Sequence, residues 1–197
     1  MGLLIGLVRH GKTDWNAKGI IQGQTDISLN EEGIAQAGAL ASRLSKEERI
    51  WDAVISSDLQ RARRTAAIIA ERLNIPVLEP DTRLRERYFG EIEGTTEQER
   101  LERWGADWRE LSLGMESDTA VRARGTEAIS DLMKREEGHS VLVVSHGSFI
   151  AQMLKELCAD LEDSRLGNLS YSILERQEDA WQPLLHNCTR HLEEIKV

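Results

Sequence analysis

The sequence predicts an α/β fold, a three-layer α/β/α sandwich with a mostly parallel central sheet. Three short apolar runs, at residues 3–8, 53–55 and 141–144, predict strands that are buried on both faces. Segments with apolar residues at helical spacing follow these runs, which is the order of crossover helices between parallel strands. The length of 197 residues and the 40% hydrophobic content fit a single domain, 1–197, with its own core.

The predicted helices follow from start signals and apolar periodicity. Ser28 with Glu31 has the spacing of a capping box, and Ser57 with Gln60 repeats it, so a helix is expected after each serine. Inward-facing residues recur at helical spacing after both boxes: Ile34, Ala37, Ala41 and Leu44, then Ala62, Ala66, Ile69 and Leu73.

The second half continues the pattern with less regular spacing. A short helix is expected within 96–108, a longer one from Ser117 to a stop at Gly138, and another across 147–158. Residues 77–78 predict a short edge strand. Residues 169–174 and 181–185 predict a strand pair that turns at 178–179.

The composition limits the partners of the chain. The net charge of −9 argues against nucleic acid and against an anionic membrane surface, but a locally positive pocket can still bind a small anion. No apolar run reaches the length of a membrane span. Two cysteines, Cys158 and Cys188, fit a reducing compartment. A soluble cytoplasmic protein is expected, and the sequence leaves its oligomeric state open.

Polar, reactive residues follow the three strongest strands. Arg9-His10-Gly11 follows the first, residues 56–58 the second, and Ser145-His146-Gly147 the third. Ligands bind at the carboxyl ends of parallel strands, so these segments are expected to converge, and glycine lets a ligand approach the backbone. Arg61 lies in the first turn of a helix, where free N–H groups favour an anion. Such a site suits a phosphomonoester dianion.

These residues carry a family resemblance. Residues 7–13, which include Arg9-His10-Gly11, resemble the Arg-His-Gly signature of the histidine phosphatase superfamily, the phosphoglycerate mutase-like enzymes. Trp15-Asn16 follows the signature as in the family. Four further segments are similar to family motifs, in the same order, between residues 4 and 175: 23–33, 56–66, 84–94 and 143–147. Five motifs in this order make the resemblance specific, and within the superfamily the phosphatase branch is expected for the reasons given below.

The resemblance implies a mechanism without metal or cofactor. His10 is then the nucleophile that forms a phosphohistidine, and Arg9, Arg61 and a protonated His146 hold the phosphoryl oxygens. Nearby anions would raise the pKa of His146. Glu86 is the general acid and then the base, a role helped by apolar neighbours and the charge of the bound phosphate. The remaining expected substrate-binding residues are Asn16, Gly23, Gln24, Thr25 and Gly147.

Other residues have simpler interpretations. Three histidines (His139, His186 and His191) are expected to be ordinary surface or core residues. Three arginines (Arg63, Arg64 and Arg72) are expected on a solvated helix face. Trp104 and Trp108, at i and i+4, are typical of a core or lid staple. Three serines (Ser56, Ser57 and Ser145) suit capping or pocket lining, because no Gly-x-Ser-x-Gly elbow is present.

The first functional hypothesis is hydrolysis of a small phosphorylated metabolite, with broad or dedicated specificity. The alternative, an isomerase reaction, is cofactor-dependent phosphoglycerate mutase. The variable segment at about 91–117 is expected to be a lid. Residues 91–115 hold seven acidic residues against three arginines, a net charge of −4 that suits a bisphosphorylated substrate poorly. Residues 86–90 read Glu-Arg-Tyr-Phe-Gly, where the mutases tend to show Glu-Arg-His-Tyr-Gly.

Two other classes of protein are less well supported. A non-catalytic phosphoprotein-binding module is disfavoured because every expected catalytic position is filled. Residues 6–13 satisfy the P-loop pattern literally, but residues 6–8 continue the apolar strand and no Walker-B strand is apparent. A dinucleotide-binding oxidoreductase needs a Gly-x-Gly-x-x-Gly turn after the first strand, and the chain has none there.

Overall fold

A five-stranded sheet in the order β2-β3-β1-β4-β5 forms the centre of the molecule. The computed structural model describes residues 3–49, 51–158, 161, 165–178 and 180–195. The strands are β1 (Leu4–Arg9), β2 (Ala53–Ser56), β3 (Val141–Ser145), β4 (Tyr171–Gln177) and β5 (Ala180–Cys188). β1 pairs parallel with β3, and β3 with β2, whereas β4 pairs antiparallel with both β1 and β5.

The prediction of a mostly parallel sheet therefore holds for three strands only, while β4 and β5 form the strand pair predicted around 169–174 and 181–185. β4 and β5 are joined without a crossover helix, and a direct hairpin requires antiparallel pairing. Of the predicted turn, Asp179 lies outside the described residues. Glu178 has a positive φ of 54°, the left-handed conformation found in tight turns.

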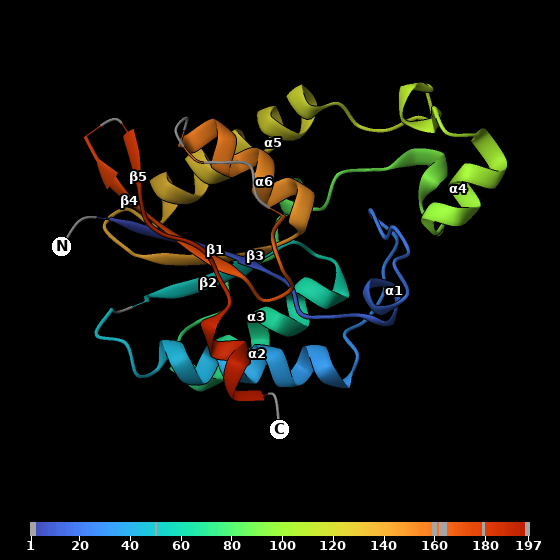
Figure 1. Cartoon of the computed structure of the whole chain (residues 1–197). Helices are drawn as coiled ribbons and strands as arrows, with labels where there is room; N and C mark the ends of the chain where they lie inside the picture. Colours follow the sequence, from blue (N-terminus) through green and yellow to red (C-terminus); the bar gives the residue numbers. More distant parts are fainter. Residues whose placement is uncertain (1–2, 50, 159–160, 162–164, 179, 196–197) are drawn as a thin grey trace.

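Helices cover both faces of the sheet and confirm the three-layer sandwich (Figure 1). α5 (Asp118–Arg135) and α6 (Gly147–Leu157) lie on one face, and α2 (Glu31–Leu44) and α3 (Gln60–Leu73) lie on the other. Two short helices, α1 (Asp14–Ala17) and α4 (Glu97–Trp104), lie beyond the carboxyl end of β1. Four 3-10 turns complete the described chain: 82–84, 90–92, 108–110 and 190–195. No described helix is long and apolar enough to cross a membrane.

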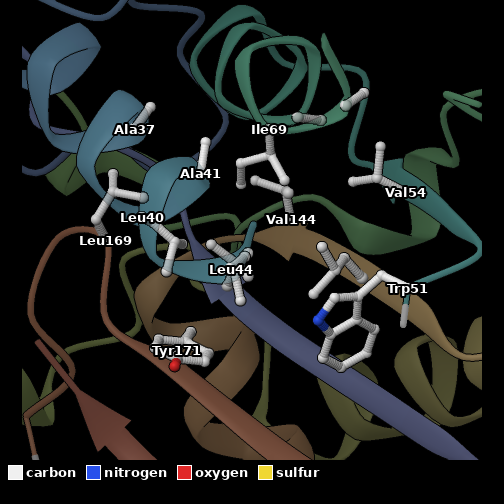
Figure 2. Packing of buried hydrophobic residues seen from close by; sticks show 14 of the residues in the cluster. Ala37, Leu40, Ala41, Leu44, Trp51, Val54, Ile69, Val144, Leu169 and Tyr171 are labelled. Carbon is white, nitrogen blue, oxygen red and sulfur yellow. The ribbon is translucent and has the colours of Figure 1, made fainter. Parts of the chain in front are cut away.

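Alternate residues of the strands build two hydrophobic cores, one on each face. Val144 packs under α2 and α3, and its neighbour Val143 packs under α5 and α6. Figure 2 shows the first core, where α2 contributes its predicted inward stripe. Ile34 departs from that prediction because it lies in the first turn of α2, where it lines an open groove with Val77 and is 42% exposed.

Two of the predicted helix starts are wrong by two residues. The N-cap of α2 is Asn30, which accepts a 2.9 Å hydrogen bond from the N–H of Gly33. α3 begins at Gln60, whose N–H donates to Asp26 Oδ1 at 2.8 Å. Asn30 therefore caps α2, and the distant Asp26 binds the first N–H of α3. Ser28 does not cap α2, because its Oγ donates to Gln60 Oε1. Ser117 caps α5 as predicted.

The variable segment 91–117 has a small core of its own. Trp108 is buried with Ile92 and Leu113, and Trp104 packs against them, which confirms the two tryptophans as a staple. The guanidinium groups of Arg100 and Arg109 lie 4.9 and 4.2 Å from the Trp108 ring. Residues 77–78 form no full strand, since Val77 makes one isolated bridge to Val54.

Candidate active site

Strand register brings the two predicted histidines together. Arg9 of β1 lies opposite Ser145 of β3 in a parallel pair, so the next residues, His10 and His146, emerge at the same edge of the sheet. Their ring centroids are 5.1 Å apart, and both side chains are buried. The convergence expected from the sequence is confirmed here.

His10 is held in one tautomer. Its Nδ1 lies 2.7 Å from the carbonyl oxygen of Gly11. A carbonyl only accepts hydrogen bonds, so Nδ1 carries the proton and Nε2 keeps its lone pair. Burial, followed by the positive charges of Arg61 and Arg9, lowers the pKa of His10 well below its ordinary value. The ring is therefore neutral near pH 7, which is the nucleophilic form.

His146 is also neutral, contrary to the sequence-based expectation of a protonated ring. Its Nδ1 accepts a 3.3 Å hydrogen bond from Arg61 Nε, and its Nε2 lies 2.7 Å from Ser57 Oγ. Burial and the charge of Arg61 lower the pKa of His146 well below its ordinary value. The expected anions do not appear among the causes of this shift. Of the two roles expected for Ser57, capping and pocket lining, the structure supports the second, because Ser57 is a hydrogen-bond partner of this histidine and not the cap of α3.

Arg61 connects His146 to the loop at 23–25. The side chain is 1% exposed, and it donates from Nη1 to Thr25 O at 2.8 Å and from Nη2 to Gly23 O at 2.6 Å. Burial lowers its pKa to about 10, so the guanidinium remains charged. The predicted position of Arg61 in the first turn of α3 is confirmed.

Glu93 holds the same loop from the opposite side, and sequence reasoning missed it. Its carboxylate accepts from the N–H of Gln24 at 3.0 Å, and from the N–H and hydroxyl of Thr25 at 3.2 and 2.9 Å. It also accepts from the N–H of Phe89 at 3.0 Å. The backbone amides of Gln24 and Thr25 are thus bound to Glu93, while their neighbouring carbonyls bind Arg61. No periodicity or motif distinguishes this one acid in the sequence.

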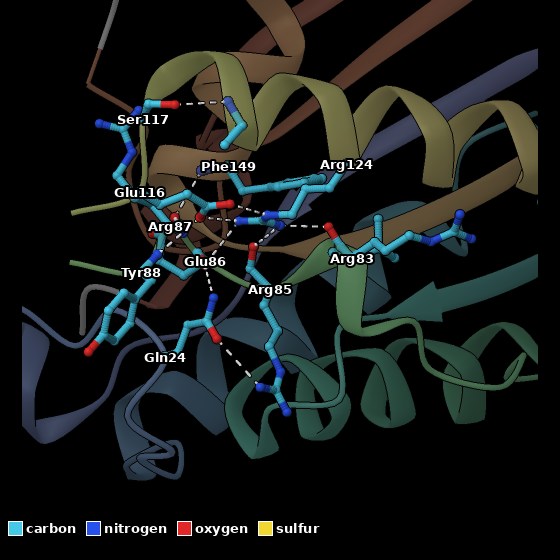
Figure 3. Close-up of polar contacts among 12 residues, drawn as sticks. Gln24, Arg83, Arg85, Glu86, Arg87, Tyr88, Glu116, Ser117, Arg124 and Phe149 are labelled. Carbon is cyan, nitrogen blue, oxygen red and sulfur yellow. Dashed lines mark hydrogen bonds and ion pairs between the residues drawn. The ribbon is translucent and has the colours of Figure 1, made fainter. Parts of the chain in front are cut away.

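Glu86 lies at the N-terminus of α6, the helix that begins directly after His146. Its carboxylate accepts from the N–H groups of Ser148 at 3.1 Å and Phe149 at 2.9 Å, and from that of Arg87 at 2.9 Å (Figure 3). The N–H groups of Ser148 and Phe149 belong to the first turn of α6, where the helix dipole favours a negative charge. The structure therefore fixes Glu86 beside the segment that carries His146.

A cavity of about 510 Å³ opens between Arg9 and Glu86. Arg9 donates from Nη1 to Leu166 O at 2.6 Å, and its guanidinium lies against the bare backbone of Gly147, where a Cβ would come within 3.3 Å of Nε. The exposed Arg165 also lines this cavity, and the sequence analysis did not single it out. The cavity combines two arginines with one carboxylate.

Asn16 reaches the site through a neighbouring amide. Its Oδ1 accepts from Thr13 Oγ1 at 3.2 Å and from Asn168 Nδ2 at 3.1 Å, and Asn168 also donates to His10 O at 3.2 Å. With Oδ1 engaged, the Nδ2 group is the part of Asn16 that a ligand can use.

The glycine after His10 is required by the packing of the fold itself. A Cβ at Gly11 would come within 2.5 Å of the carbonyl oxygen of Gly33, at the start of α2. The close approach is therefore between two segments of protein backbone.

Several predicted bystanders are confirmed as such. Arg63, Arg64 and Arg72 are exposed, and so is His139, while His191 is buried against Tyr171 away from the site. Among the residues that the structure describes, no three His, Cys, Asp or Glu side chains are grouped as metal ligands.

This site holds a neutral, oriented imidazole beside a second one, with two arginines and a carboxylate, and such a set of groups suits phosphoryl transfer through histidine. The family model of the histidine phosphatase superfamily (branch 1) matches residues 5–189. The chain belongs to this superfamily, and it is a phosphomonoester hydrolase.

Relatives in the family include both phosphatases and mutases. The chain is 34% identical to an uncharacterised phosphatase, PhoE, of Bacillus subtilis (94% of this chain, 95% of the relative). It is 36% identical to a metal-independent phosphoserine phosphatase of Arabidopsis thaliana (90% and 78%). It is 39% identical to a probable phosphoglycerate mutase, GpmB, of Serratia proteamaculans (91% and 87%).

Solved structures share the whole fold. Bacillus stearothermophilus YhfR superposes with a TM-score of 0.85 at 28% identity (96% of this chain, 99% of that chain). A mycobacterial glucosyl-3-phosphoglycerate phosphatase, solved with VO3, gives a TM-score of 0.82 at 32% identity (94% and 99%).

Proposed function

We propose that the chain hydrolyses small phosphomonoesters through a phosphohistidine on His10, without a metal ion. The observation that carries this proposal is the hydrogen bond from His10 Nδ1 to Gly11, which leaves the Nε2 lone pair for attack on phosphorus. In the first step an N–P bond forms at Nε2, the ester P–O bond breaks, and Glu86 donates a proton to the leaving oxygen. In the second step Glu86 accepts a proton from water, the water oxygen attacks phosphorus, and His10 is released.

The arginines of the site stabilise the negative charge of the transferring phosphoryl group. Arg61 is buried and Arg9 is half-buried, both lie near enough to His10 to lower its pKa, and preorganised cations of this kind stabilise the transition state. We assign His146, Asn16, the 23–25 loop and Gly147 to binding the phosphoryl group and its ester. A bound dianion opposes the effect of Arg61 on His146 and raises the pKa of His146 on binding.

The segment 91–117 forms the lid of the single domain 1–197 in this proposal. It is hydrogen-bonded to the loop before Gly23, through the N–H of Gly94 to Ile21 O at 2.8 Å and the N–H of Ile21 to Thr95 O at 3.1 Å. Its three arginines interact within the segment: Arg100 with Glu97, Arg109 with Glu97, and Arg103 with the Trp104 ring. Seven acidic residues outnumber these arginines in 91–115, and two of the arginines are paired with Glu97, which favours hydrolysis over the mutase reaction.

The finer proposal is a substrate with a second anionic group, such as a phosphorylated carboxylic acid. Arg165 lines the cavity beside Arg9 and Glu86, where the leaving part of the ester lies. Two relatives are described as phosphatases of such compounds, phosphoserine and glucosyl-3-phosphoglycerate, which supports this class. We place the reaction in the cytoplasm, in line with two cysteines that remain free.

The direct test is hydrolysis of p-nitrophenyl phosphate from pH 5 to 8 in EDTA, with the wild type and His10→Ala. The proposal predicts turnover that persists in EDTA and disappears in the variant. Equal turnover by the two proteins, or dependence on an added divalent cation, would contradict it. O-Phosphoserine and 3-phosphoglycerate are then compared, the latter with and without bisphosphoglycerate, to separate hydrolysis from isomerisation.

A further inference from the structure

One arginine of α5 binds the backbone of the loop that carries Glu86. Arg124 donates from Nη1 to Arg83 O at 2.6 Å and to Arg85 O at 2.8 Å, and from Nη2 to Glu86 O at 3.2 Å (Figure 3). Three carbonyls within four residues thus accept from a single guanidinium. These bonds hold the backbone of the loop, together with those from Gln24 Nε2 to Glu86 O at 3.1 Å and from Ser145 Oγ to Leu84 O at 2.7 Å.

The same guanidinium is oriented by a second residue, Glu116. Arg124 Nε lies 2.7 Å from Glu116 Oε1, and Nη2 lies 2.9 Å from Oε2, a two-point pairing that fixes the plane of the guanidinium. Glu116 is also tied to the loop, since its N–H donates to Tyr88 O at 2.8 Å and its carboxylate accepts from the N–H of Tyr88 at 3.2 Å. The loop at 83–88, which carries Glu86, is therefore bound near its start by Arg124 and at its end by Glu116.

Arg124 also lies against the group that holds the carboxylate of Glu86. Its guanidinium is 5.3 Å from the centroid of the Phe149 ring. The backbone N–H of Phe149 is the 2.9 Å donor to Glu86 Oε1. Arg124 thus binds the backbone of Glu86 directly and contacts the ring of Phe149, the residue whose N–H binds the Glu86 carboxylate.

We propose that Arg124, oriented by Glu116, is a positioning residue for the acid–base chemistry of Glu86. This inference rests on the proposed function, because it assigns a purpose to Arg124 only if Glu86 donates the proton. It requires an arginine: five N–H donors in one plane serve three carbonyls and a carboxylate, and the compact ammonium of lysine cannot replace them. Glu116 lies near the end of the 91–117 lid, so this ion pair also joins the lid to the loop of Glu86.

The test compares two substrates that differ in their need for an acid. p-Nitrophenolate leaves as a stable anion, whereas phenolate leaves more readily with a proton. A displaced Glu86 should therefore slow phenyl phosphate selectively. We expect Arg124→Lys to reduce kcat/KM for phenyl phosphate about 10- to 100-fold, with less than about a threefold loss for p-nitrophenyl phosphate. Arg122→Gln, two residues away on α5 and paired with Glu156, is the matched control and should leave both rates unchanged.

A second pair of variants separates positioning from mere stabilisation. Glu116→Gln keeps Arg124 and removes the charge that orients it, so it should show a smaller selective loss. If Arg124→Lys does not fold, Glu116→Gln alone tests whether Arg124 positions Glu86. In a Glu86→Gln background the selective effect of Arg124→Lys should disappear, because there is no acid left to position.

The outcomes separate this inference from the proposed function. One outcome is that Glu86→Gln loses activity selectively toward phenyl phosphate while Arg124→Lys and Glu116→Gln do not, or lose it equally for the two substrates. That outcome overturns the positioning role of Arg124 and leaves the proposed function standing. If Glu86→Gln shows no selective loss, the acid assigned in the proposed function is wrong, and the inference fails with it.

Discussion

The Nδ1 atom of His10 donates a 2.7 Å hydrogen bond to the carbonyl oxygen of Gly11, the next residue in the chain. The tautomer of the nucleophile is thus set by local backbone geometry and not by a carboxylate. A carboxylate partner would stabilise the protonated ring, whereas a neutral carbonyl inside a buried, cationic site leaves it neutral. The arrangement keeps His10 reactive without a negative charge that would repel a phosphate dianion.

Buried neutral histidines make the fold sensitive to acid. The pKa values of His10 and His146 lie well below 6.5, and burial lowers that of His191 to about 4. Below pH 6.5 the unfolded chain binds protons that the folded chain does not, so the free energy of unfolding falls with falling pH, by up to about 1.4 kcal/mol per pH unit for each histidine. Urea unfolding at pH 7, 6 and 5 should show this loss, with a shallower slope for His191→Gln. A free energy of unfolding that is constant from pH 7 to 5 would contradict it.

Arg61 should contribute most of its effect through the phosphoryl group. We expect Arg61→Gln to reduce kcat/KM for p-nitrophenyl phosphate about 10²- to 10³-fold, as for the loss of one preorganised donor. The control is Arg63→Gln, an exposed arginine two residues later on the same helix, which should stay near wild type. Similar losses in both variants would mean that general electrostatic attraction, and not Arg61 in its site, drives turnover.

The loop at 23–25 should depend on the charge of Glu93. In wild type the Glu93 carboxylate accepts hydrogen bonds from the N–H groups of Gln24 and Thr25. In Glu93→Gln an amide NH2, itself a donor, faces some of these N–H groups. A hydrogen bond to a charged group is worth about 1.5–3 kcal/mol, so we expect kcat/KM to fall about 10- to 100-fold. Steady-state kinetics of Glu93→Gln and of the exposed neighbour Glu91→Gln check this. Wild-type kinetics in Glu93→Gln would show that the loop does not take part.

Arg165 should select among substrates. In Arg165→Gln we expect KM for O-phosphoserine at low salt to rise about fivefold, the effect of a partly solvated ion pair, with KM for p-nitrophenyl phosphate unchanged. Arg64→Gln, exposed on α3, is the control. Equal changes for the two substrates would remove the second-anion proposal and leave the phosphatase reaction intact.

The sequence predicts the reacting centre well because backbone rules determine it. Parallel strands end at the same edge of a sheet. The segments that follow the strands at 3–8 and 141–144 are therefore expected to lie together, and His10 and His146 do so. Arg61 follows from its place in the first helical turn. The position of Glu86 came from the family resemblance, and its local periodicity carries no such signal.

The surrounding shell was not predictable by the same rules. Glu93, Arg124 and Glu116 act on backbone carbonyls and N–H groups of distant loops, and such contacts leave no repeat or spacing in the sequence. The pKa of His146 is shifted in the opposite direction from the one expected, because that expectation rests on nearby anions. In the folded chain burial and Arg61 dominate.

Trapping the intermediate shows whether His10 Nε2 carries the phosphoryl group during turnover. The variant Glu86→Gln still attacks p-nitrophenyl phosphate but cannot activate water, so it should accumulate the phosphoenzyme. Mass spectrometry of the protein, quenched at alkaline pH in EDTA, should show one added phosphoryl group that is labile to acid and maps to His10. An intermediate on another residue, or hydrolysis by Glu86→Gln,His10→Ala at the rate of Glu86→Gln alone, would contradict the account.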